Sequence, residues 1–170
     1  ASYYLGCLFY DRFGYDKAIM LWEKAISINP EYAKAYRNLS LAYFDKKQDF
    51  LGAKVCMEKA LEFLPTEPRL IMEYQQLLKN MDYTPEKRLE IYEKYNDLMM
   101  QRDDCYLDKI TLKCLAGKYE EAINMAKQRR FHIYEGGEGK LTKQHAWMHV
   151  LYGNELTKNG NYAKAEEIYK

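Results

Sequence analysis

Residues 2–30 read SYYLGCLFYDRFGYDKAIMLWEKAISINP and residues 36–65 read YRNLSLAYFDKKQDFLGAKVCMEKALEFLP, with the same pattern of small residues in both. In the first stretch, three small residues and the closing proline are separated by steps of 12, 7 and 5, beginning at Gly6. The second stretch begins at Ser40 and repeats these steps with one extra residue in its turn. The two closing prolines are 35 residues apart. Self-similarity at this period predicts stacked helical hairpins, each too small to bury its apolar faces alone.

The small residues indicate how each hairpin packs. Gly6 and Ser40 are expected on the first helices of two hairpins, because small side chains let two backbones approach closely. Ala18 and Ala53 are their expected neighbours on the second helices. The proline that closes each repeat ends the second helix, since proline cannot continue it. The remaining apolar residues at helical spacing should face the partner helix or the next hairpin; they are Leu5, Phe9, Trp22, Leu39, Tyr43 and Met57.

This pattern resembles the tetratricopeptide repeat family. The small position of the second helix recurs after 35, 35, 34 and 43 residues, at Ala18, Ala53, Arg88, Ala122 and Ala165. Arg88 is large for this position, so we expect the third hairpin to pack more loosely or to shift its register. The resemblance implies an all-α fold, a right-handed α-solenoid of about five antiparallel hairpins with nine or ten helices.

The expected organisation is a single array, with units at about 1–32, 33–67, 68–102, 103–131 and 141–170 and a glycine-rich insertion at 132–140. The chain starts without a methionine and stops inside a repeat pattern, so we expect a fragment of a longer protein. Ends of this kind expose apolar helix faces. They predict adjoining repeats or domains, or self-association of the fragment.

The composition argues against several classes of function. Lysine and arginine total 26 against 25 acidic residues, and a net charge of +1 gives no electrostatic reason to bind nucleic acid or an acidic membrane surface. No apolar run approaches the ~18 residues that a membrane span needs. The four cysteines form no C-x-x-C pair and are expected to be reduced. Together with the lack of a signal-peptide pattern, this predicts a cytoplasmic protein.

The insertion carries a second resemblance. Residues 131–140, FHIYEGGEGK, together with QRDD at 101–104 and RRFH at 129–132, look like a bacterial family of uncharacterised proteins. In that family an N-terminal β-sandwich domain, similar to sugar mutarotases, precedes tetratricopeptide repeats. The family tends to have Pro-Trp where this chain has Ile133-Tyr134. The resemblance implies an interaction module, and a long glycine-bearing connection is often functional. The candidate loop residues are His132, Tyr134, Glu135 and Glu138.

Two arrangements of histidine could in principle carry chemistry. His145 and His149 are four residues apart on one predicted helix and could share a metal ion. A metalloprotease would have glutamate where Ala146 stands, and a structural role is favoured for both histidines. His132 could form an acid–base pair with a glutamate of the insertion, although solvated glutamates are favoured. No serine or cysteine lies in a triad context, so we expect no enzyme, no metal site and no cofactor.

The better candidate site is the concave groove lined by the first helices of successive hairpins. Aligning the units predicts that its partner-binding residues are Tyr3, Tyr10, Arg37, Asn38, Leu41, Phe44, Met72, Gln76, Asp108, Trp147 and Asn154. A chaperone-binding subgroup of the family grips a C-terminal carboxylate with lysine, arginine and asparagine. Asn38 matches one member of that set, but Tyr3 and Cys7 replace the lysine and asparagine of the first unit. A carboxylate clamp is therefore not expected.

Two functions remain open. The first is a scaffold that binds a protein or peptide partner, or its own N-terminal domain, through the concave helix surface. The alternative is an accessory module that contributes to a carbohydrate-related site completed by a missing N-terminal domain. Aromatic side chains can stack on sugars, but the fragment shows no pair of carboxylates of the kind that glycosidases use.

Overall fold

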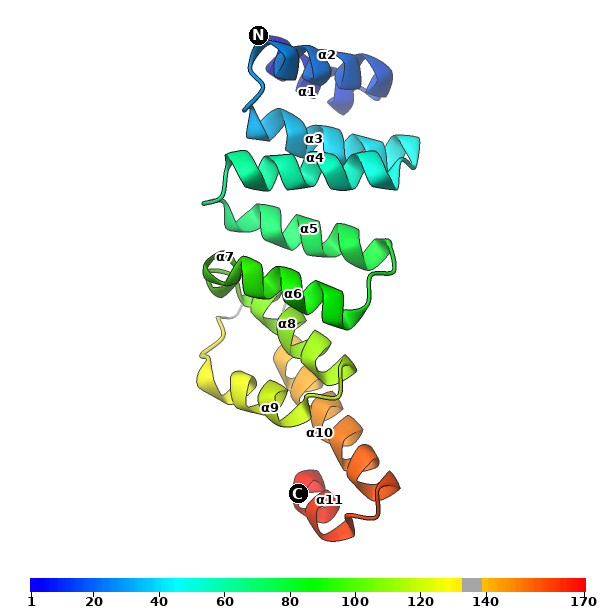
Figure 1. Ribbon diagram of the computed structural model, residues 1–170, viewed down its shortest axis with the longest axis vertical. Helices are drawn as coiled ribbons and strands as arrows, with labels where there is room; N and C mark the ends of the chain where they lie inside the picture. Colours follow the sequence, from blue (N-terminus) through cyan, green and yellow to red (C-terminus); the bar gives the residue numbers. More distant parts are fainter. Residues whose placement is uncertain (133–138) are drawn as a thin grey trace. The chain divides into compact units, whose positions relative to one another are not determined.

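The computed structural model describes residues 1–132 and 139–170, and the regular structure in this part of the chain is entirely helical (Figure 1). It comprises eleven α-helices and one short π-helix, whereas the sequence predicted nine or ten helices. The all-α fold class is confirmed. The chain divides into two compact units, Ala1–Tyr83 and Thr84–Lys170, and each is described by itself.

Unit 1 contains two helical hairpins and one further helix. Its elements are α1 (Ser2–Asp11), α2 (Tyr15–Ile28), α3 (Ala33–Ala42), the π-helix η1 (Tyr43–Lys47), α4 (Phe50–Phe63) and α5 (Pro68–Asn80). Helix α1 packs on α2 and α3 packs on α4, while α2 also contacts α3 and α4 contacts α5. Each hairpin is therefore stacked on the next, as the repeat predicts.

Capping residues fix where α4 and α5 begin. The Asp49 side chain precedes α4 and accepts a hydrogen bond from the backbone N–H of Gly52 at 2.9 Å. Glu67 precedes α5 and accepts from the backbone N–H of Arg69 at 3.2 Å, with Pro68 at the first helical position. Both arrangements satisfy N–H groups that have no partner within their own helix. The prolines of the repeat, in turn, lie just after the ends of α2 and α4.

Small residues bring the hairpin helices of unit 1 together. Ala18 and Ala53 are fully buried. The Ser40 hydroxyl donates a hydrogen bond to the backbone carbonyl of Ala53 at 2.7 Å, so this expected close approach is confirmed. In the first hairpin Gly6 lies against Trp22: a Cβ placed on Gly6 would be 2.5 Å from the indole Nε1. That indole N–H donates to a carbonyl of α1, and the ring fills the space a side chain would need.

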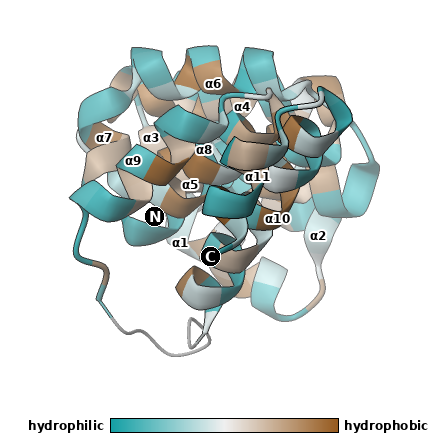
Figure 2. Ribbon diagram, turned by 90° about the horizontal axis from the view of Figure 1, so that it is seen from below, coloured by the Kyte–Doolittle hydropathy of each residue, from teal (hydrophilic) through white to brown (hydrophobic). Residues whose placement is uncertain are grey.

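Unit 2 contains six helices among its described residues. They are α6 (Pro85–Lys94), α7 (Asn96–Met100), α8 (Asp103–Leu115), α9 (Tyr119–Gln128), α10 (Lys140–Lys158) and α11 (Tyr162–Tyr169). Helix α8 packs on α9, α10 packs on α11, and α6 contacts α8. The short α7 accounts for part of the excess over the predicted number of helices. Figure 2 shows hydrophobic and hydrophilic segments alternating along the individual helices, as packing on one side requires.

Arg88 occupies the small position of α6 without being exposed. Its side chain is only 7% exposed and forms an ion pair with Asp108 of α8 at 2.6 Å. The Tyr92 hydroxyl donates to the same carboxylate at 2.9 Å. A hydrogen-bonded charge pair with α8 thus lets the arginine be buried, which the sequence alone did not predict.

No helix within residues 1–132 and 139–170 is long and apolar enough to cross a membrane. All four cysteines are free thiols. Burial raises the pKa of Cys56 to about 11 and that of Cys105 to about 12, so these thiols stay protonated near neutral pH. They behave as small apolar residues of the core.

We predict that Gly6→Ala destabilises unit 1, because the added Cβ would overlap the Trp22 ring and the indole would have to move. The expected loss is about 1–3 kcal/mol in the free energy of unfolding, the usual range for overpacking. Urea or thermal unfolding followed by circular dichroism measures it. Lys24→Ala on the exposed face of α2 is the control. An unchanged unfolding midpoint for Gly6→Ala would contradict the close packing.

We also predict that Arg88→Met destabilises unit 2 by about 2–4 kcal/mol. Asp108, whose side chain is only 29% exposed, would lose the cation that it pairs with. The unfolding free energy of Arg88→Met, Asp108→Asn and the double variant gives a double-mutant cycle. The double variant should cost less than the sum of the two single changes. Simple additivity would show that the two side chains do not interact.

Candidate partner-binding groove

One face of unit 1 is formed by α1, α3 and α5, and polar side chains link these helices. The Asn38 amide on α3 donates to the Tyr3 hydroxyl and to the Cys7 sulfur on α1, both at 3.4 Å. Arg37, the preceding residue of α3, reaches Glu73 on α5. The first helices of successive hairpins therefore share this face, as expected from the alignment of the repeats.

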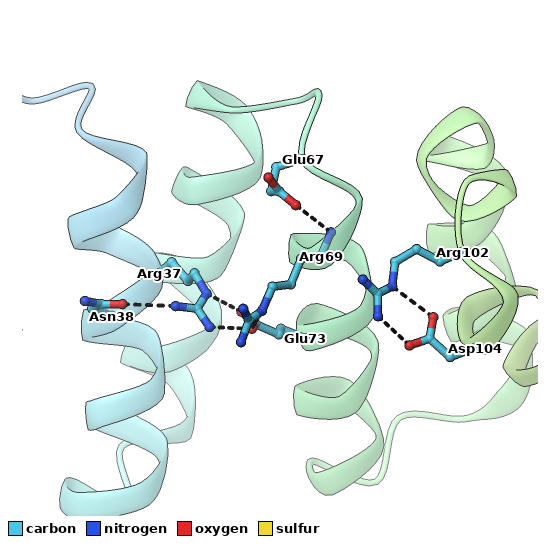
Figure 3. A network of polar contacts seen from close by, with 7 residues as sticks. All are labelled: Arg37, Asn38, Glu67, Arg69, Glu73, Arg102 and Asp104. Carbon is cyan, nitrogen blue, oxygen red and sulfur yellow. Dashed lines mark hydrogen bonds and ion pairs between the residues drawn. The ribbon is translucent and has the colours of Figure 1, made fainter. Parts of the chain in front are cut away.

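Glu73 is held between two arginines (Figure 3). Arg37 donates through Nε and Nη2 to the two carboxylate oxygens of Glu73, at 2.6 and 2.5 Å. Arg69, four residues before Glu73 on α5, donates to the same carboxylate at 2.8 Å. The Glu73 side chain is only 10% exposed. Its hydrogen bond raises the pKa of Arg37, so this arginine is firmly charged and already paired within the chain.

An apolar cavity of about 190 Å³ lies between the C-terminal parts of α3 and α5. Four of the predicted groove residues line it together: Leu41, Phe44, Met72 and Gln76. Met57 and Leu77 complete its apolar lining, and its other lining residues are polar: Ser40, Asp45, Glu73 and Asn80. Phe44 also packs against Phe50, with 5.3 Å between the ring centroids. A cavity with an apolar lining and a few polar groups is the usual form of a binding pocket.

A second cavity, of about 390 Å³, lies nearer the start of α3 and α5. It is lined by two predicted groove residues, Tyr3 and Arg37, and by Lys34, Glu67 and Arg69 among others. Burial raises the pKa of Tyr3 to about 12, helped by the neighbouring Cys7. The phenol therefore stays neutral near pH 7 and acts as a hydrogen-bonding group.

The other predicted groove residues have different surroundings. Tyr10 packs inside the first hairpin, 5.5 Å from Trp22 and 5.1 Å from Tyr15 between ring centroids, and it lines neither cavity. Asp108, Trp147 and Asn154 belong to unit 2. Asp108 is the partner of Arg88, and Asn154 accepts a hydrogen bond from the Tyr169 hydroxyl at 2.8 Å. Trp147 is half-buried on α10. Their role in binding stays a prediction.

The residues before the insertion are fixed to the start of α8. Asp103 accepts a hydrogen bond from Arg129 Nε at 2.7 Å and another from the backbone N–H of His132 at 2.9 Å. The guanidinium of Arg129 also lies 4.7 Å from the centroid of the Tyr106 ring. The structure thus joins the two stretches, 101–104 and 129–132, that carry the second resemblance. His132 itself is 88% exposed, and Tyr134, Glu135 and Glu138 lie outside the described residues.

The arrangement of His145 and His149 fits a structural role. Their ring centroids are 4.1 Å apart, and His149 Nδ1 lies 2.8 Å from the backbone carbonyl of His145. Partial burial lowers the pKa of His145, and the neighbouring His149 lowers it further. In the part of the chain that the structure describes, no group of three or more His, Cys, Asp or Glu side chains could hold a metal ion.

Sequence reasoning missed Lys34, Arg69 and Glu73. The available signal was charge at matching positions of consecutive repeats, since Arg37 and Glu73 are 36 residues apart, about one repeat. Arg69 and Glu73 also have the spacing of an i, i+4 pair on one helix. Opposite charges one repeat apart on first helices would have indicated an ion pair across the groove.

We predict that Asp103→Asn lowers the stability of unit 2 by about 2 kcal/mol near neutral pH, since the carboxylate accepts charge-assisted hydrogen bonds. Burial alone would raise the Asp103 pKa, but the bonds from His132 and Arg129 outweigh it and the pKa is lowered. The stabilisation is therefore present above the unfolded pKa of about 3.9 and is lost as the pH falls through the lower folded pKa.

The measurement is urea unfolding of both proteins over a pH series. The difference between wild type and Asp103→Asn should shrink as the pH falls below about 4. Asp97→Asn, an exposed change on α7, is the control. A difference that is independent of pH would contradict the role of the charged carboxylate.

Residues 6–47 match the family model described as TPR repeat. The chain is similar to the crystal structure of YrrB, described as a TPR protein with an unusual peptide-binding site; the identity is 19%, the TM-score is 0.67, and the match covers 98% of this chain and 80% of YrrB. MamA from Desulfovibrio magneticus RS-1 is 11% identical with a TM-score of 0.63, and the match covers 99% of this chain and 89% of the MamA chain. The Pseudomonas aeruginosa pilF structure is 17% identical with a TM-score of 0.57, and the match covers 99% of this chain and 72% of pilF. The chain thus has the fold of tetratricopeptide repeat proteins, and the family match itself falls on the first hairpin and the first helix of the second.

Proposed function

We propose that this chain is a protein-interaction scaffold that binds an extended segment of a partner protein along the α1/α3/α5 face of unit 1. The observation that carries the proposal is the apolar cavity between α3 and α5, which brings Leu41, Phe44, Met72 and Gln76 together. An open apolar cavity beside charged groups can hold one side chain of a peptide and orient the rest. The description of YrrB as having a peptide-binding site supports the same use of this fold.

The polar contacts of this face disfavour a clamp for a chain terminus. The Asn38 side-chain nitrogen donates to Tyr3 and Cys7. Arg37 donates to Glu73 and to the Asn38 side-chain oxygen, the latter at 3.2 Å. A terminal carboxylate would have to displace these bonds. An internal segment of the partner, held by its side chains, fits the face better.

The remaining parts of the proposal rest on the sequence. We place the scaffold in the bacterial cytoplasm, without a catalytic step or cofactor, and its own N-terminal domain is one possible partner. The accessory role in a carbohydrate-related site depends on Tyr134, Glu135 and Glu138, which lie outside the described residues. No observation on the described residues favours that alternative.

We predict that Phe44→Glu abolishes binding of peptides selected against the wild-type chain from a random display library. A charge in the apolar cavity is costly, and the loss of affinity should be at least about ten-fold. Gln76→Trp provides a second variant, because Gln76 is exposed at the cavity edge and a larger side chain there blocks entry without burying a charge. Fluorescence anisotropy with the selected peptides measures the affinity.

The matched control is Val55→Glu, which places the same charge on an exposed residue of α4. Circular dichroism checks that all variants are folded at the temperature of the assay. Peptides that bind Phe44→Glu and Gln76→Trp as tightly as wild type would show that the face of unit 1 is not the binding site.

A further inference from the structure

We propose that the unit 1 face selects a segment in which a bulky apolar side chain and a side-chain carboxylate are about three residues apart. The apolar side chain enters the cavity between Leu41 and Met72, and the carboxylate meets the cations Lys34 and Arg69 in the neighbouring cavity. This inference rests on the proposed function and deepens it by naming the chemistry of the ligand.

The size of the apolar cavity fits one large side chain. Its volume is about 190 Å³, and its apolar lining includes Leu41, Phe44, Met57, Met72 and Leu77. A dry protein cavity of ~150 Å³ with a similar lining can hold a benzene molecule. A leucine, methionine or phenylalanine side chain is thus of the right size. The two methionines can adapt their shape to any of the three.

The neighbouring cavity carries an excess of positive charge. Arg37 and Arg69 share a single carboxylate, Glu73, and this leaves the charge of one guanidinium uncompensated. Lys34 is exposed and forms no ion pair within the described part of the chain. Glu67 is the carboxylate that lines this cavity, and it also caps α5, whereas Glu73 lines the neighbouring apolar cavity. Three cations therefore face two carboxylates, and a third carboxylate from a ligand would balance them.

The cationic groups are accessible to a ligand. The Arg69 side chain is 60% exposed although one of its nitrogens contacts Glu73. Its remaining donors can bind a second carboxylate, since a guanidinium has five N–H groups. Lys34, on the first turn of α3, can approach the same carboxylate from the opposite helix.

The spacing of the two cavities sets the spacing within the ligand. Along α3 and η1, residues 33–37 contribute to the lining of the cationic cavity and residues 40–45 to that of the apolar one. Their centres are about seven residues apart, which is roughly 10 Å at ~1.5 Å per helical residue. A peptide in the extended polyproline II conformation advances about 3.1 Å per residue with three residues per turn, so side chains three positions apart lie on one face and span roughly this distance. The carboxylate and the apolar anchor should therefore be about three positions apart.

The test uses the full chain and amidated glycine–serine peptides that carry a fluorophore, one leucine and one glutamate three positions away. Replacing leucine with alanine should weaken binding about ten-fold or more, because one buried apolar side chain is lost. Replacing glutamate with glutamine should weaken binding about two- to five-fold at low salt, and this difference should shrink as salt is added. A peptide with the leucine and the glutamate at adjacent positions should bind about as weakly as the glutamine peptide.

A charge swap connects the ligand to the protein. Lys34→Glu should weaken binding of the glutamate peptide while leaving the glutamine peptide unchanged, and it should favour a peptide with lysine in place of glutamate. Lys24→Glu, an exposed change on α2 of the same unit, is the matched control and should change none of these affinities. Both variants alter exposed residues, so the fold should be kept.

The outcomes separate this inference from the proposed function. Equal affinity for the glutamate, glutamine and lysine peptides, with binding still abolished by Phe44→Glu, would overturn the charge assignment and leave the scaffold function standing. Tighter binding of a peptide with a free C-terminal carboxylate in place of the glutamate would overturn the choice of a side-chain carboxylate. If neither these peptides nor the library-selected ones depend on Phe44, the groove itself is refuted.

Discussion

The close approach of the two helices in each hairpin is the constraint on which the rest of unit 1 depends. Ser40 can donate to the backbone carbonyl of Ala53 only because both residues are small. In the first hairpin Gly6 instead leaves room for the Trp22 ring, which occupies the space of its missing side chain. When the second helices are held this close, the first helices present one continuous face. Both cavities of that face lie between α3 and α5.

The fold was largely predictable from spacing, because small residues and prolines act locally and their positions can be counted. Asp49 and Glu67 stand directly before the helices they cap, a local signal that the sequence predictions did not use. Arg88 shows where such reasoning stops. Its size predicted a loose hairpin, but a partner 20 residues away, Asp108, lets the charge be buried. Whether a large charged residue loosens or stabilises a contact depends on what faces it in three dimensions.

The groove shows the same limit for function. Alignment of the repeats predicted its apolar residues, and Leu41, Phe44, Met72 and Gln76 do line one cavity. It did not predict the electrostatics, because those depend on which side chains share a partner. Glu73 neutralises Arg37 and also binds Arg69, so a residue expected to hold a ligand is held by the chain itself. Pairing of this kind changes the ligand chemistry that the face favours without changing its shape.

The residues just before the insertion are held in place by contacts within unit 2. Arg129 and His132 are tied to Asp103, and Arg102 pairs with Asp104 at 2.6 Å (Figure 3). Each of the two stretches supplies half of this anchor at the start of α8. Their charges are used within unit 2 and need no ligand to account for them. A binding role for the insertion would therefore have to come from its residues beyond His132, and not from the arginines and aspartates that hold it in place.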